Sequence, residues 1–81
     1  MNVGMLWFDN DPRTALTAKV ARAADYYRQK YGLVPDLCLV HPSMLAETRP
    51  DQVEDAAGKV VVRPNRAIMP GHLWIGTEDQ N

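Results

Sequence analysis

Apolar residues occur along the chain in short runs that polar turns separate. The first run, residues 3–8, contains only apolar residues and glycine and shows no polar alternation, which is typical of a strand buried on both faces. Residues 36–40 form a second short strand candidate, which is apolar after its first residue, Asp36. Residues 59–63 and 72–76 follow a glycine and a Pro-Gly pair, which indicate turns. The pattern therefore predicts four strands.

Residues 12–31, between the first two strands, have the periodicity of a helix. Asp11 followed by Pro12 predicts its start, because a carboxylate caps free N–H groups and proline suits the first helical position. Gly32 is placed to end the helix in a left-handed conformation. One stripe of the helix is expected to face the core and comprises Leu16, Val20, Ala23, Ala24, Tyr27 and Tyr31.

A strand, a helix and a strand in succession predict a β-α-β unit with parallel strands and a right-handed crossover. Two more strands follow, so we predict an α+β fold with a four-stranded sheet and one long helix, at about residues 12–31, on one face. Short helical turns are expected at residues 44–47 and 50–57. We interpret residues 1–81 as one small domain that ends in a polar tail at residues 77–81.

The composition is that of an ordinary globular protein, with 46% hydrophobic and 23% charged residues and a net charge of −1. Cys38 is the only cysteine, so no internal disulfide can form, and we expect a reducing cytoplasm. No apolar run approaches the ~20 residues that span a bilayer, and residues 1–8 lack a basic leader, so neither a membrane segment nor a secretory signal is expected.

The basic residues are distributed unevenly along the chain. Between Arg13 and Tyr31, five basic residues accompany a single acidic one, Asp25. Such a surface suits phosphate backbones, and a tyrosine within it offers a ring for base stacking, although a solvated helix flank is the simpler interpretation. The residues predicted to bind a nucleic acid or another partner are Lys19, Arg22, Tyr26 and Lys30 on the helix and Lys59, Arg63 and Arg66 around the third strand.

Asp9 and Asp11 come directly after the first strand. Two carboxylates at the carboxyl end of a strand can hold Mg²⁺ beside a phosphate. The segment 8–11 resembles the aspartate motif of haloacid-dehalogenase-type phosphatases, which implies a metal-dependent phosphodiesterase as one alternative. That family has glycine after the second aspartate, where this chain has Pro12. We prefer the interpretation in which Asp9 caps the turn and Asp11 caps the helix.

The layout of the first half of the chain also resembles the small ferredoxin-like nucleases of CRISPR adaptation. The resemblance lies in a first strand that ends at Asp9, a basic helix that ends at Tyr31 and Gly32, and a strand after it. The chain departs from that family after the helix, where no second long helix is evident. Residues 26–32 and 37–42 further resemble segments of short uncharacterised bacterial proteins, a likeness that implies no function.

Cys38, His41 and His72 are of the residue types that bind zinc. A structural zinc site takes four ligands, usually from a paired motif, and the chain has one cysteine. Cys38 lies within a strand, where it is expected to be an apolar core residue. We therefore predict no metal, no cofactor and no catalytic residue.

A core of this size is barely sufficient for independent stability, and one helix can cover only one face of the predicted sheet. Trp7 and Trp74 are large side chains to bury within it. The preferred hypothesis is a non-catalytic protein-interaction module that acts as a homodimer or as a subunit of a larger assembly. The alternatives are an accessory protein that binds DNA or RNA through its basic helix, and the phosphodiesterase that would use Asp9 and Asp11.

Overall fold

The structure, a computed structural model, describes residues 4–45, 52–55 and 58–78. The described residues form one α-helix, one 3-10 helix and a five-stranded sheet. The elements in chain order are β1 (Gly4–Phe8), α1 (Leu16–Tyr31), β2 (Leu37–Val40), η1 (Pro42–Leu45), β3 (Gln52–Asp55), β4 (Gly58–Pro64) and β5 (His72–Gly76).

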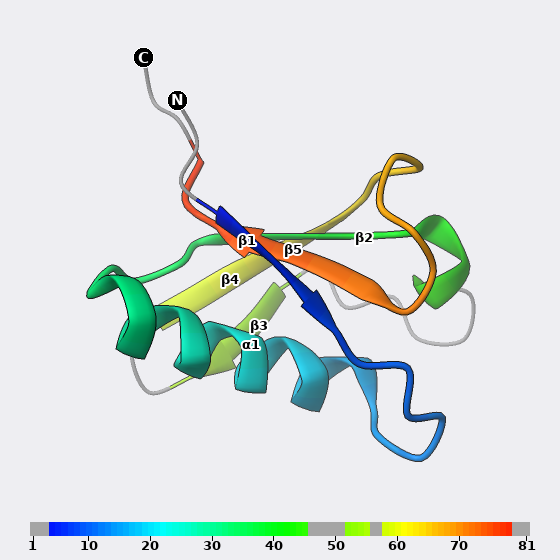
Figure 1. The fold of residues 1–81 in the computed structure, drawn as a ribbon, viewed down its shortest axis with the longest axis horizontal. Coiled ribbons are helices and arrows are strands. Elements are labelled where there is room, and N and C mark those ends of the chain that lie inside the picture. The colour runs from blue at the N-terminus through cyan, green and yellow to red at the C-terminus, as the bar shows by residue number, and fades with distance from the viewer. Residues whose placement is uncertain (1–3, 46–51, 56–57, 79–81) are drawn as a thin grey trace.

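The strands lie in the order β1-β5-β2-β4-β3 (Figure 1). β5 is antiparallel to both of its neighbours, β1 and β2, while β2 and β4 are parallel and β3 is antiparallel to β4. β1 and β2 therefore run in the same direction, as predicted for the ends of a β-α-β unit, but β5 lies between them. The predicted α+β class is confirmed, and each of the four predicted strands is present.

Two local predictions need correction. The helical turn predicted at residues 50–57 is wrong where the structure describes it, because Gln52–Asp55 forms β3 and pairs with β4. The turn predicted at residues 44–47 occurs slightly earlier, as the 3-10 helix η1. The remaining residues of both predictions lie outside the described segments.

The helix begins at Leu16, four residues after the predicted start at Pro12. Residues 11–14 form a separate turn instead, in which the Thr14 amide donates to the Asp11 carbonyl oxygen at 3.3 Å. Ala15 is the N-cap residue and supplies no side-chain hydrogen bond. Gly32 ends α1 as predicted, with φ of 67° in the left-handed region that favours glycine.

The core lies between α1 and one face of the sheet, and Figure 1 shows the helix lying along that face. The predicted core stripe is confirmed for five of its six residues, and Tyr31 at the helix end is exposed. The sheet contributes buried side chains at alternate positions, namely Cys38, Val40, Val60, Val62, Leu73 and Ile75. No helix in the described segments combines the length and the apolar character that crossing a membrane requires.

Candidate interaction surface

The sheet face opposite α1 also carries apolar side chains, and we call it the outer face. Because successive side chains in a strand alternate between faces, the neighbours of the buried residues point away from the helix. The strand register places these side chains next to one another across four strands. The apolar residues of the outer face are Leu6 and Phe8 in β1, Trp74 in β5, Leu37 and Leu39 in β2, and Val61 in β4.

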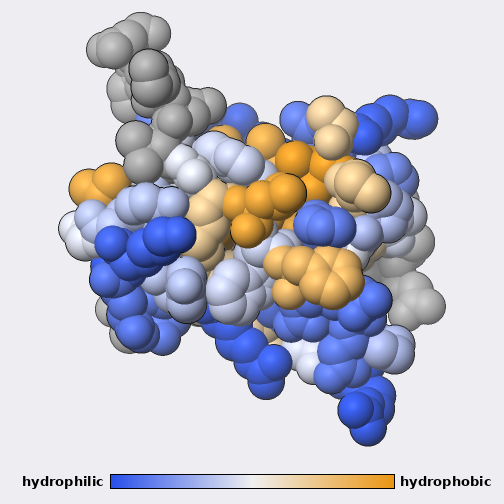
Figure 2. Space-filling model, viewed as in Figure 1, coloured by the Kyte–Doolittle hydropathy of each residue, from blue (hydrophilic) through white to orange (hydrophobic). Residues whose placement is uncertain are grey.

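Exposure of these side chains increases toward β1, at one edge of the sheet. Leu37 is buried, and Leu39, Val61 and Trp74 are half-buried. In contrast, Leu6 and Phe8 are 61% and 59% exposed. Figure 2 shows apolar side chains gathered over the region that β1 and β5 occupy in Figure 1. The sequence predicts a first strand buried on both faces, but among the described residues the side chains of β1 that face away from α1, Leu6 and Phe8, are exposed.

The exposed aromatic residues at this edge are held in defined positions. The rings of Phe8 and His72 lie 4.8 Å apart between centroids, and the Phe8 ring also lies against Gly71. The Trp74 indole lies over Gly4 and occupies the space that a β-carbon at that position would need. Glycine at position 4 is therefore required by the close approach of an aromatic ring. The aromatic side chains of the outer face near β1 thus have packing contacts within the chain, and side chains that are already packed lose less conformational entropy on binding.

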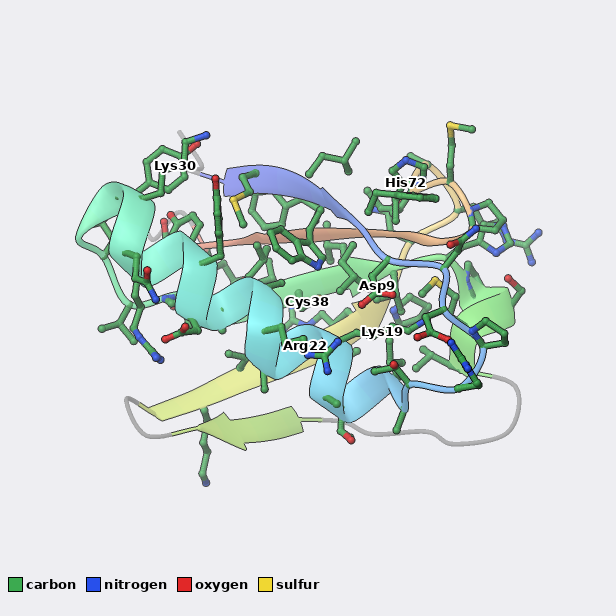
Figure 3. The ribbon with its side chains drawn as sticks, turned by 60° about the horizontal axis from the view of Figure 1, so that its bottom comes forward. Asp9, Lys19, Arg22, Lys30, Cys38 and His72 are labelled. Atoms are coloured by element: carbon green, nitrogen blue, oxygen red, sulfur yellow. The ribbon has the colours of Figure 1, made fainter. Side chains whose placement is uncertain are left out.

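Lys19, predicted on the solvated basic flank, is only 8% exposed, so that prediction is wrong for this residue. Its ammonium group lies 4.0 Å from a carboxylate oxygen of Asp9, which is also largely buried. Figure 3 shows the two side chains lying together between the end of β1 and the first turns of α1. The carboxylate of Asp9 compensates the positive charge of Lys19, because a largely buried charge is stable only when it is paired. Lys19 is therefore less accessible than an exposed lysine, and its predicted binding role stays a prediction.

The other three predicted binding residues of the helix are exposed: Arg22, Tyr26 and Lys30. Tyr26 also packs within the molecule, because its ring centroid lies 5.1 Å from that of Trp7. Lys30 lies at the far end of α1 from Arg22, with its ammonium group 5.4 Å from the centre of the Tyr31 ring (Figure 3). The flank thus retains two separated cations.

The structure does not join the basic residues of β4 to those of the helix. Val60 and Val62 are buried beneath α1, so the alternation places Lys59 and Arg63 on the opposite, outer face. Arg63 is exposed and forms an ion pair with Glu78 at 3.3 Å. Arg66 is exposed in the turn that follows β4. A single basic patch made of both groups would need both faces of the domain, and the binding role of these residues stays a prediction.

Asp9 and Asp11 accept hydrogen bonds from the turn that joins β1 to α1. An Asp9 carboxylate oxygen accepts from the Asp11 amide at 3.1 Å, and Asp11 accepts from the Arg13 amide at 2.9 Å and from the Thr14 hydroxyl at 3.2 Å. The bond from the Arg13 amide lowers the pKa of Asp11 below its ordinary value. The predicted cap on the helix is wrong for Asp11, because this carboxylate stabilises the preceding turn.

The described residues contain no group of three or more histidine, cysteine, aspartate and glutamate side chains placed to hold a metal ion. Cys38 is fully buried in the core, as predicted, and this burial raises the pKa of its thiol to about 12. The His41 ring contacts Ser43, 2.8 Å from its hydroxyl, and the His72 ring lies against Phe8. Cys38, His41 and His72 therefore each contact different neighbours.

The most distinctive feature of the described surface is therefore the apolar outer face at the β1 edge. Sequence reasoning predicted that something must cover a second sheet face, but it did not single out Leu6 and Phe8. The register of β1 with β5 is the signal that places both side chains on that face. Comparison of the chain with protein-family models, with curated proteins and with solved structures found no match.

Proposed function

We propose that this chain is a small protein-interaction module without a catalytic role, and that it acts as a homodimer through the outer face at its β1 edge. The observation that carries the proposal is the exposure of Leu6 and Phe8, at 61% and 59%, on a face that continues as half-buried apolar side chains across the sheet. Exposed apolar patches with a polar surround mark interaction surfaces.

The area available supports a second copy as the partner. A stable interface buries about 800 Å² on each partner. That is about 15% of the 5218 Å² of accessible surface on this chain, which one face of a two-layer domain can supply. The net charge of −1 creates little repulsion between two copies. A dimer would also stabilise a domain whose own core is small. The cytoplasm is the proposed location, supported by the single, buried Cys38.

The test is the mass in solution, measured by light scattering over a range of micromolar concentrations. We expect about twice the 9.1 kDa of one chain. Leu6→Lys should give the monomeric mass, because it places a charge at the centre of the patch. Val34→Lys is the matched control, since Val34 is 53% exposed and lies outside the sheet, between α1 and β2. A monomer at about 100 µM, where even weak dimers form, would contradict the proposal.

Nucleic-acid binding is the second candidate, and the exposure of Arg22, Tyr26 and Lys30 on α1 favours it. Replacing Arg22 and Lys30 with glutamine should weaken retention on DNA or RNA equally for all sequences. Each replacement should also reduce the slope of affinity against salt by roughly one unit. Arg28→Gln is the control, because the guanidinium group of Arg28 lies on the same helix and is paired with Asp25 at 2.9 Å. Absence of retention at low salt would exclude this candidate.

A further inference from the structure

β1 is the outermost strand at one end of the sheet, and no described residue pairs with its outer edge. Free strand edges invite pairing with another chain, and proteins usually protect them with charges, proline or a bulge. β3, at the opposite edge, carries Glu54 and Asp55 in its sequence. β1 has the sequence GMLWF, without a charge or a proline, and it pairs with β5 in continuous register over all five residues.

The register also shows which backbone groups of β1 point outward. Asp9 continues the pairing beyond the strand, and its amide donates to the carbonyl oxygen of Gly71 at 3.0 Å. In an antiparallel pair, such bonds recur at every second residue. Met5 and Trp7 therefore direct their N–H and C=O groups toward β5. The corresponding groups of Gly4, Leu6 and Phe8 point away from the sheet.

We propose that the β1 strands of two copies pair antiparallel about a two-fold axis at Leu6, which joins the two sheets into one of ten strands. The proposal rests on the proposed homodimer and specifies its interface. Centring the pair on Leu6 uses all three outward-pointing residues of each strand. The two Leu6 residues face each other, and Gly4 of each copy faces Phe8 of the other.

The side chains at this edge suit that register. The two exposed Leu6 side chains meet on the outer face, where cross-strand apolar pairs stabilise a sheet. Phe8 of the second copy lies beside Gly4, which has no side chain and is covered by the Trp74 indole. Two aromatic rings therefore come together where a larger residue at position 4 would leave no room. The charge-free strand adds no like-charge repulsion across the two-fold axis.

Disulfide crosslinking tests the register directly. In the proposed pair, the two Leu6 Cα atoms lie about 5.5 Å apart, which is within the range that a disulfide spans. Leu6→Cys should therefore crosslink two copies under mild oxidation about 100-fold faster than a random encounter, because the thiols are held at millimolar effective concentration. Val34→Cys, with similar exposure away from the edge, is the control. The native Cys38 is fully buried and should not react.

A second pair of variants separates backbone pairing from side-chain packing. Leu6→Pro removes an N–H that points toward the second copy and leaves the bonds to β5 intact, so an edge strand tolerates it. Leu6→Ala removes nearly the same side chain but keeps the N–H. We expect the proline variant to raise the dimer dissociation constant at least tenfold more than the alanine variant. Circular dichroism of each monomer shows whether the fold is retained.

The outcomes distinguish the proposed interface from the proposed homodimer. A dimeric mass combined with rapid crosslinking of Leu6→Cys supports both. A dimeric mass with crosslinking no faster than in Val34→Cys overturns the edge pairing, because the two copies then meet through another surface. This result holds even if Leu6→Pro fails to fold. A monomer at all concentrations overturns both proposals.

Discussion

The two faces of the sheet carry the same kinds of apolar residue, but the described residues bury the face toward α1 far more completely than the outer face. Beneath α1, Leu73 of β5 is fully buried. Leu6 lies one strand away on the outer face, and its side chain is 61% exposed. The single α-helix of the described segments has 16 residues and packs on one face. The comparison shows that an apolar strand is not evidence of burial within its own chain. In the proposed dimer the second copy contributes cover at the β1 edge, where the two Leu6 side chains meet.

The largest expected effect is a difference in stability when the same substitution, leucine to alanine, is made on each of the two faces. Leu73→Ala should lower the free energy of unfolding by about 2–5 kcal/mol, because it leaves a cavity in the core. Leu6→Ala should change it by no more than about 0.5 kcal/mol in the monomer, because the side chain is already solvated there. Urea denaturation at a protein concentration below the dimer dissociation constant measures both values. Equal losses of unfolding free energy in the two variants would contradict the difference in burial between the two faces.

The next effect concerns the charged pair at the rim of the covered face. Asp9→Asn should cost about 1–3 kcal/mol, because it leaves the largely buried Lys19 without its counter-charge. Lys19→Met should cost less, since its side chain retains the apolar contacts of the lysine stem. A double-mutant cycle monitored by urea denaturation gives the coupling energy. A coupling near zero would show that the 4.0 Å pair contributes nothing to stability.

A smaller effect is expected on the outer face itself. Gly4→Ala places a methyl group where the Trp74 indole lies, so the ring must move. We expect a loss of about 1 kcal/mol and a shift in tryptophan emission as the indole becomes more hydrated. Gly58→Ala is an unsuitable control because of its positive φ of 150°, so Ala67→Gly in the exposed turn after β4 serves instead. An unchanged emission spectrum would contradict the packing of Trp74 over Gly4.

The smallest expected effect is a loss of folding stability in acid, which depends on the Asp11 carboxylate. The pKa of Asp11 is lower in the folded chain than its ordinary value of 3.8. The unfolded state therefore binds more protons than the folded state, so the contribution of Asp11 is present above about pH 4 and is lost as the pH falls through the folded pKa. Melting temperatures measured between about pH 5 and 2.5 should fall less steeply in Asp11→Asn. An identical slope in both proteins would exclude Asp11 as a contributor.

The strands β1, β2, β4 and β5 and the core stripe of the helix could be predicted, because each depends on the local hydrophobic pattern. Val20, Ala23 and Tyr27 follow the helical period and are buried as predicted. The start of the helix could not be predicted, because an Asp-Pro pair is as suitable for an isolated turn as for the first turn of a helix. β3 was missed because its sequence is charged and it is a strand only through its pairing with β4.

The candidate surface could be predicted only in outline. An uninterrupted apolar run conceals which of its residues lie on which face, so Leu6 and Phe8 could not be distinguished from Met5 and Trp7. The register with β5, which lies far from β1 in the sequence, determines which of these side chains lie on the outer face. The burial of Lys19 could not be predicted for a similar reason. Its partner Asp9 comes near only when the chain folds and the end of β1 meets the start of α1.

The pairing of β1 with β5 has a consequence for how the protein is made. The ribosome synthesises β1 first and β5 last among the described strands, so β1 cannot pair with β5 until all the other described elements have emerged. During that interval an apolar strand remains unprotected on the nascent chain, where it invites wrong contacts. Pairs that are distant in sequence also form slowly, because a long loop must close first. During synthesis, the apolar strand β1 therefore stays unpaired until β5 has been made.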